Sequence, residues 1–368
     1  GKLTYSNFVN GEKNLTGFVK IADGLTASSA ALKTGNIAFS TEDGKGSLNK
    51  EDVKPEPPTP PTPTYPEDQK ADKFDQGISG NDEKYKEEGI LKEDGSYVFT
   101  KNPTKIEVKE GAAVGATDKD IVIDTTKAKL ELKGATGINA EGANVTVKGN
   151  TSISGATGIN AANGNVTLNG STVISGTDAA INAGENANVN VNGNNSALKI
   201  NGSINADGGN ITVDSGNASS TITGDINAAN GGSVVISLIE KNSVLNGGYN
   251  VDGNSSIALS LANGATWNLT DGEEAAGMSL LRIAKAPVAA PAKGLTINGG
   301  KTEAETGYLN MTKRSKALQI ADYSGWETII YNHDNKGSEA QDFKSGNTVI
   351  SNAKEGSGVI LFTDSDNI

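Results

Sequence analysis

The side chains that most often do chemistry are sparse in this chain of 368 residues, which contains no cysteine and one histidine. The lack of cysteine excludes disulfides, thiolate zinc sites and cysteine nucleophiles. The lone histidine, His333, excludes a multi-histidine metal site and leaves one place for a histidine base, in a triad with Asp334 or another aspartate. We favour the simpler interpretation that His333 lies in a surface turn.

Asparagine is the polar residue with the most regular spacing. The triplet Ile-Asn-Ala begins at residues 138, 159, 181, 204 and 226, at spacings of 21, 22, 23 and 22 residues. A turn and an alternating run such as Asn144-Val145-Thr146-Val147 follow the triplet, and a third apolar spot such as Ile153 comes next. Clusters of glycine, asparagine, aspartate and serine separate these spots. One unit therefore contains three short strands and closes after about 22 residues.

A repeat of this length indicates a solenoid or a propeller. A propeller blade needs about 40–45 residues, and the fixed pattern of leucine-rich repeats is missing. Three short strands per unit fit a parallel β-helix, whose coils stack about 4.8 Å apart. We therefore predict an all-β fold, a parallel β-helix or solenoid with about 22 residues per coil.

In such a coil the isoleucines of the triplets line the interior, and the asparagines form a column one residue along. Stacked asparagines can hydrogen-bond through their amides. If this column faces solvent it is a candidate binding surface, and if it points inward it is structural. Its members are Asn139, Asn160, Asn182, Asn205 and Asn227. The glycosylation-like patterns at Asn144, Asn165 and Asn210 coincide with the repeat, which explains them without a sugar.

The chain divides by composition into four predicted segments. Residues 1–50 form the first β-helix coils, 51–96 a proline-rich and charged insertion, 97–286 the regular β-helix, and 287–368 a loop followed by C-terminal coils. Seven of the ten prolines lie between Pro55 and Pro66, which predicts an extended polyproline segment. Because loops on a rigid scaffold often carry function, the insertion is a candidate recognition element.

Charge and hydropathy exclude two classes of partner. The chain carries 44 acidic and 32 basic side chains, a net charge of −12, which argues against binding nucleic acid or anionic lipid. No apolar run reaches the length of about 18 residues that a membrane-spanning helix requires. No signal segment follows Gly1, so an exported protein would have been longer than this sequence.

Several segments resemble known elements. Residues 257–269 followed by Ser279-Leu280-Leu281, and Ser324-Gly325-Trp326 leading into residues 329–333, resemble recurring elements of autotransporter passenger domains. Residues 24–29 and 35–39 resemble elements of large surface adhesins of this secretion type. The resemblance implies a right-handed β-helix at the surface of a Gram-negative bacterium. It also implies attachment to the outer membrane only through a C-terminal β-barrel that lies outside this sequence.

From the repeat and the resemblance together we expect a surface adhesin without enzymatic activity, cofactor or metal. It would support cell–cell aggregation and biofilm formation, or attachment to host or partner cells. Its partners would be a second copy of itself, or a host or bacterial surface protein or glycan.

The alternative is a carbohydrate-active enzyme or a glycan-binding module, in which Trp267 or Trp326 stacks on a sugar. Filling an enlarged corner of the coil is our preferred role for both tryptophans. Polysaccharide lyases and hydrolases need clustered carboxylates or a basic residue as catalytic base. The acids of the repeat region stand singly, at Glu141, Asp178, Glu185, Asp207, Asp214 and Asp225.

Overall fold

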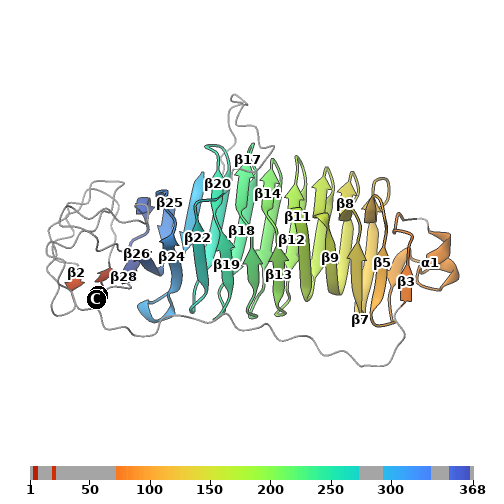
Figure 1. Ribbon diagram of the computed structural model, residues 1–368, viewed down its shortest axis with the longest axis horizontal. Coiled ribbons are helices and arrows are strands. Elements are labelled where there is room, and N and C mark those ends of the chain that lie inside the picture. The colour runs from red at the N-terminus through yellow and green to blue at the C-terminus, as the bar shows by residue number, and fades with distance from the viewer. Residues whose placement is uncertain are drawn as a thin grey trace.

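The protein is an elongated coil of short parallel strands (Figure 1). The computed structural model describes residues 72–80, 82–272, 293–332 and 348–364, together with the backbone of β1 (Leu3–Ser6) and β2 (Val19–Ile21). The strands form a β-solenoid of about nine turns with about 23 residues per turn. This confirms the parallel β-helix that the repeat predicts. The right-handed sense implied by the resemblance stays a prediction.

The first face of the coil contains the alternating runs of the repeat, such as Asn144-Val145-Thr146-Val147. Val145 and Val147 point into the coil and are buried, whereas Thr146 between them is half-buried on the outside. This is the period of two that a half-buried strand requires. The first face contains β4 (Ser96–Val98), the starts of β7 (Ile121–Lys133) and β9 (Val145–Ala162), β10 (Asn165–Asn169), β12 (Asn188–Asn192), β15 (Asn210–Asp214), β18 (Ser233–Leu238), β21 (Ser256–Leu261) and β23 (Gly294–Asn298).

The second face contains the third apolar spot of each repeat. It consists of β3 (Asp72–Phe74), β5 (Thr104–Glu107), the end of β7, the middle of β9, the start of β11 (Thr172–Ala183), β13 (Leu198–Asn201), β16 (Thr221–Thr223), β19 (Val244–Gly247), β22 (Thr266–Thr270), β24 (Gly307–Lys313), β26 (Trp326–Asn332) and β28 (Gly358–Asp364). β23 also pairs with β25 (Leu318–Ser324), which pairs with β27 (Thr348–Ala353).

The third face contains the Ile-Asn-Ala triplets. Its members are β6 (Ala112–Ala116), β8 (Thr136–Glu141), the ends of β9 and β11, β14 (Ile204–Asp207), β17 (Ile226–Ala229) and β20 (Tyr249–Val251). The triplets pair in register, so that Ile181 lies between Ile159 and Ile204. These three isoleucines are fully buried.

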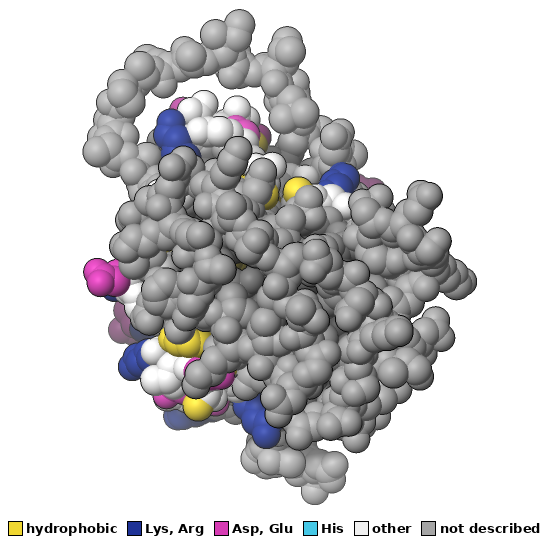
Figure 2. Space-filling model, turned by 90° about the vertical axis from the view of Figure 1, so that its left-hand side faces the viewer, with side chains coloured by type: hydrophobic (Ala, Val, Ile, Leu, Met, Phe, Trp, Pro, Cys, Tyr) yellow, Lys and Arg dark blue, Asp and Glu magenta, His cyan; other side chains and the backbone are white. Residues whose placement is uncertain are grey.

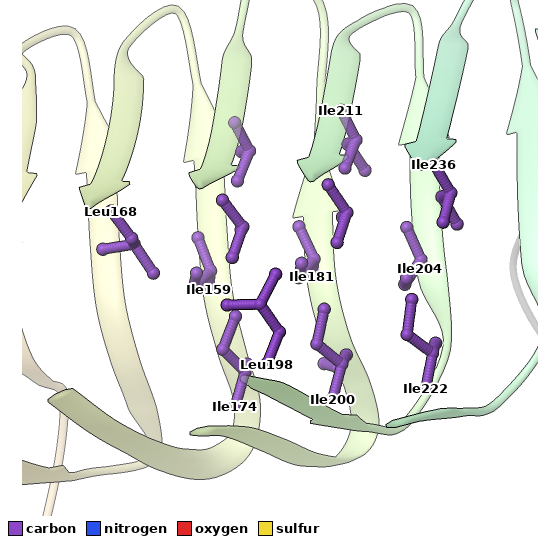
Figure 3. Close-up of a cluster of buried hydrophobic side chains, with 14 of the residues drawn as sticks. Ile159, Leu168, Ile174, Ile181, Leu198, Ile200, Ile204, Ile211, Ile222 and Ile236 are labelled. Carbon is purple, nitrogen blue, oxygen red and sulfur yellow. The ribbon is translucent and has the colours of Figure 1, made fainter. Parts of the chain in front are cut away.

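Branched aliphatic side chains fill the interior from all three faces (Figure 3). On the second face Ile174, Ile200 and Ile222 stack in the same way as the triplet isoleucines, one turn above another. Burying one such side chain contributes about 2 kcal/mol to stability. Because each turn covers the next, the apolar core is a continuous column along the axis, and each buried residue depends on its neighbours in the adjacent turns.

The corners need backbone conformations that most residues avoid, and asparagine and glycine supply them. Asn163, Asn186 and Asn230 have φ of 53°, 59° and 54°. Gly170 has φ of 132°, and a Cβ there would lie 2.5 Å from the carbonyl oxygen of Gly149 in the preceding turn. The glycine and asparagine clusters between strands are therefore corners, as the repeat predicts.

One end of the coil is closed by residues 72–99, which include the helix α1 (Glu83–Glu87). Phe74, Tyr85, Tyr97 and Phe99 are buried there, and the Tyr85 ring lies 4.8 Å from that of Phe74 and 5.7 Å from that of Tyr97. β3 pairs with β5, and β4 pairs with β7. Residues 72–96, the described half of the predicted insertion, thus join the end of the coil.

At the other end, β28 pairs antiparallel with β1, and β1 pairs antiparallel with β2. The remaining residues before Asp72 lie outside the described part of the chain, so the four-segment division stays a prediction. The predicted loop near 287–291 and His333 also lie outside it. Helix is limited, among the described residues, to α1 and the 3-10 turn η1 (Glu303–Glu305), and none of it is long and apolar enough to cross a membrane.

Candidate binding surface

The predicted asparagine column is a ladder of hydrogen-bonded amides on the outside of the third face, in two runs, from Asn139 to Asn160 and from Asn182 to Asn250. Its members are half-buried, except Asn227, which is 1% exposed. The Nδ2 group of Asn160 donates to Oδ1 of Asn139 at 2.8 Å. Equivalent bonds join Asn205 to Asn182 at 2.9 Å, Asn227 to Asn205 at 2.7 Å and Asn250 to Asn227 at 2.8 Å. These amides bind one another, so their first role is to hold the turns in register, and a role in binding a partner stays a prediction.

A second ladder of asparagines lies at the start of the strands of the first face, and we did not predict it from the sequence. Oδ1 of Asn144 accepts both the backbone N–H of Asn165, at 3.0 Å, and its Nδ2 group, at 2.8 Å. Asn188 makes the same two bonds to Asn165, and its own Oδ1 accepts Nδ2 of Asn210 at 3.0 Å. The signal was the asparagine that begins each alternating run, which we interpreted only as a corner residue.

This second ladder ends on a carboxylate. Asp120 Oδ1 accepts the backbone N–H of Asn144 at 2.8 Å and its Nδ2 group at 3.0 Å. All Nδ2 groups of the ladder donate toward the α1 end of the coil, so its last member needs only an acceptor, which a carboxylate supplies. Because amides aligned in this way polarise one another, the ladder is a directional chain of hydrogen bonds.

Beside this ladder, the outward side chains of the first face form two rows. Thr146, Thr167, Asn190 and Thr212 form one row, in register on β9, β10, β12 and β15. The other row consists of Lys148, Asn169, Asn192 and Asp214 on the same strands. On β10 and β12 all outward side chains are uncharged amides or hydroxyls. We call the outward side chains of β7, β9, β10, β12, β15 and β18 on this face the polar strip.

The second face is different near α1, where charged side chains form a network. Glu107 binds Lys133 at 2.8 Å and Lys73 at 3.1 Å, and hydrogen bonds from these two lysines lower the pKa of Glu107 to about 2. Glu131 is bridged in the same way to Lys105 and Lys129, both at 3.0 Å. Exposed ion pairs contribute little stability individually. In a view from the opposite end of the rod, charged side chains of described residues lie near the outline of the molecule (Figure 2).

The two tryptophans occupy different settings. Trp267 is fully buried, donates through Nε1 to the Gly247 carbonyl at 2.9 Å, and meets the Tyr249 ring edge-on at 5.8 Å. It fills the interior, so a sugar could stack on it only if the coil opened. Trp326 is half-buried, and its backbone N–H donates to the carbonyl of Gly300 at 2.8 Å.

Glu327 is an ionisable residue that the sequence analysis did not single out. It lies inside the coil with no exposed surface, and neither carboxylate oxygen has a hydrogen-bond partner in the described part of the protein. Burial raises the pKa of Glu327 well above its usual range. The lack of a side chain at Gly307 makes room for it, because a Cβ there would lie 2.8 Å from Oε2.

Within the described ranges, no three histidine, aspartate or glutamate side chains come together to hold a metal ion. Arg314 is a buried basic side chain. It donates to the carbonyls of Thr270, at 2.6 Å, and Ala317, at 3.0 Å. These bonds hold the β24–β25 connection in place.

No family model, curated protein or solved structure matches this chain. The β-solenoid is consistent with the resemblance to an autotransporter passenger domain, and that agreement concerns the fold alone.

Proposed function

We propose that this chain is the adhesive rod of a bacterial surface protein, extracellular and anchored in the outer membrane in its full-length form. The β-helical rod is compatible with such a role. The observation that carries the proposal is the polar strip, in which Thr167, Asn190 and Thr212 repeat a hydrogen-bonding group once per turn on a rigid backbone. The partner is a second copy, or a protein or glycan on a host or bacterial surface.

The physical case for adhesion is multiplicity. Turns about 4.8 Å apart give each group a fixed place, so little conformational freedom is lost when a partner binds the row. Each hydroxyl or amide offers a weak bond in water, worth about 1 kcal/mol at most. A row of them, presented by many copies on a cell, binds far more strongly than one contact does.

The test is attachment of cells or beads that carry the chain. The variant Thr167→Glu/Asn190→Glu/Thr212→Glu places three like charges on the polar strip, on β10, β12 and β15. Its matched control, Ser175→Glu/Asn201→Glu/Thr223→Glu, places the same charges on the second face in the same three turns. We expect the first variant to lose aggregation or attachment at least about tenfold and the control to keep it, because only the polar strip binds. Equal behaviour of the two variants would refute the proposal.

The alternative function, in carbohydrate binding or turnover, predicts a different experimental result. A glycan-binding module or carbohydrate-active enzyme would bind or turn over a soluble polysaccharide as a single copy. Isothermal titration against a panel of polysaccharides, followed by an assay for reducing ends, separates it from a rod that works by multiplicity.

A further inference from the structure

Most outward side chains in the two rows of the polar strip are matched about a line between β10 and β12. The first row runs Val122, Thr146, Thr167, Asn190, Thr212, Val235 across six strands in register. At equal distances from the centre, threonine matches threonine on β9 and β15, and valine matches valine on β7 and β18.

The second row has the same centre and carries opposite charges at matching places. It runs Asp124, Lys148, Asn169, Asn192, Asp214, Ser237. Lys148 and Asp214 lie one strand outside the two central asparagines, one on each side. Lys148 is exposed and Asp214 is half-buried.

A twofold axis along the strand direction, lying in the contact plane at this centre, relates two copies placed face to face. It reverses the order of the turns and keeps each row opposite itself, so that every contact occurs twice. Lys148 of one copy then faces Asp214 of the other, Val122 faces Val235, and Thr146 faces Thr212. The two unmatched pairs, Thr167 with Asn190 and Asp124 with Ser237, bring no like charges together.

We infer that the polar strip binds a second copy of this chain through this twofold arrangement. The inference rests on the proposed adhesive function and names its partner. Val235 is 41% exposed and is the one large apolar side chain classed as exposed among the described residues. The arrangement covers it with a valine. Copies with a net charge of −12 repel each other, and the uncharged centre of the polar strip is where they approach at least cost.

The size of the contact sets its strength. Six strands span about 24 Å along the axis, which gives a contact below the standard size of about 800 Å² per partner. A single pair of rods therefore associates weakly and exchanges quickly. On two facing cell surfaces many pairs form together, and the adhesion is strong.

The charge pair provides the test, by sedimentation velocity of the purified chain. Lys148→Asp alone brings two aspartates together at each contact, and Asp214→Lys alone brings two lysines together. We expect each variant to self-associate at least about tenfold more weakly than the parent. Mixed in equal amounts, the two variants pair aspartate with lysine at both contacts, so association returns, as it also does in the double variant Lys148→Asp/Asp214→Lys.

Thermal unfolding of each variant confirms that the fold is unchanged. The inference is refuted if the single variants associate as well as the parent, or if mixing them restores nothing. The attachment assay separates this failure from that of the proposed function. If neither charge variant nor parent forms dimers but all still attach to cells through the polar strip, the adhesive role stands and the twofold dimer is wrong.

Discussion

At the scale of single residues, each ladder asparagine depends on its neighbours, because its amide supplies one donor and one acceptor along the axis. Gly115 occupies the ladder position one turn before Asn139. It offers no side-chain acceptor, so the ladder of the third face begins at Asn139. The backbone of Gly115 is not left-handed, and a Cβ there would make only an ordinary contact, 3.8 Å from Cβ of Ala112.

Gly115→Asn should therefore extend the ladder by one turn. We expect the free energy of unfolding to rise by about 1 kcal/mol, from one new amide hydrogen bond and a less flexible unfolded chain. Denaturant unfolding measures it. Gly115→Ala is the control, because alanine restricts the unfolded chain without adding an acceptor. If the two variants are equally stable, the ladder bond contributes nothing.

The buried carboxyl of Glu327 should make the stability of the fold depend on pH. Its folded-state pKa is raised above the unfolded value, so the folded chain keeps a proton that the unfolded chain releases. The stability it contributes is present below a pH of about 4.5, the ordinary glutamate value, and is lost as pH rises toward the folded pKa. The loss is about 1.4 kcal/mol for each pH unit within that window.

Glu327→Gln should remove this dependence, because an amide does not titrate. We expect the variant to be more stable than the parent at pH 7 and to approach it near pH 4. Denaturant unfolding at several pH values, followed with a probe in the turns around β26, measures the free energy of unfolding of each protein. The prediction fails if the parent and the variant lose stability in parallel between pH 4 and pH 7.

At the scale of elements, a strand is stabilised by the turns on either side of it. Ile181→Asp places a charge in the interior between Ile159 and Ile204. We expect it to cost more than about 4 kcal/mol, because a buried charge without a partner is among the most damaging changes. Hydrogen exchange should show lost protection in β9 and β14 as well as in β11. Lys199→Asp on the outside of β13 should leave protection unchanged, and loss confined to β11 would contradict the continuous column.

The repeated elements were predictable from the sequence, because the same pattern occurs in turn after turn. The isoleucine column, the corners and the amide ladder of the third face all follow from one period of about 22 residues. The alternation that places Ile329 in the interior also places Glu327 there, two residues earlier, so that signal was present and unused.

The elements that occur once were not predictable in the same way. In residues 72–96 the buried side chain of Tyr85 stands among lysines and glutamates, a composition from which we predict a charged insertion outside the coil. Local contacts determine the structure of this region. The Asp82 carboxylate accepts bonds from the backbone of Ser79, at 2.8 Å, and from the hydroxyl of Tyr97, at 2.7 Å. Contacts of this kind occur once, so they produce no repeating pattern that could be recognised in the sequence.

At the scale of the whole molecule, the rod separates two surfaces. The ion-pair network of Lys73, Glu107 and Lys133 lies on the second face near α1, whereas the polar strip lies on the first face and has an uncharged centre. A rigid coil keeps these surfaces apart on different faces. The charged side chains of the network therefore lie away from the centre of the polar strip.

The most direct test of the account is disulfide cross-linking between two single-cysteine variants, since the natural chain has no cysteine. We predict that Val122→Cys mixed with Val235→Cys cross-links readily, because the twofold brings these positions together. Either variant alone should cross-link poorly, because like positions lie about 24 Å apart along the axis, beyond the reach of a disulfide. Efficient cross-linking of one variant with itself, or none in the mixture at concentrations where the parent self-associates, would contradict the account.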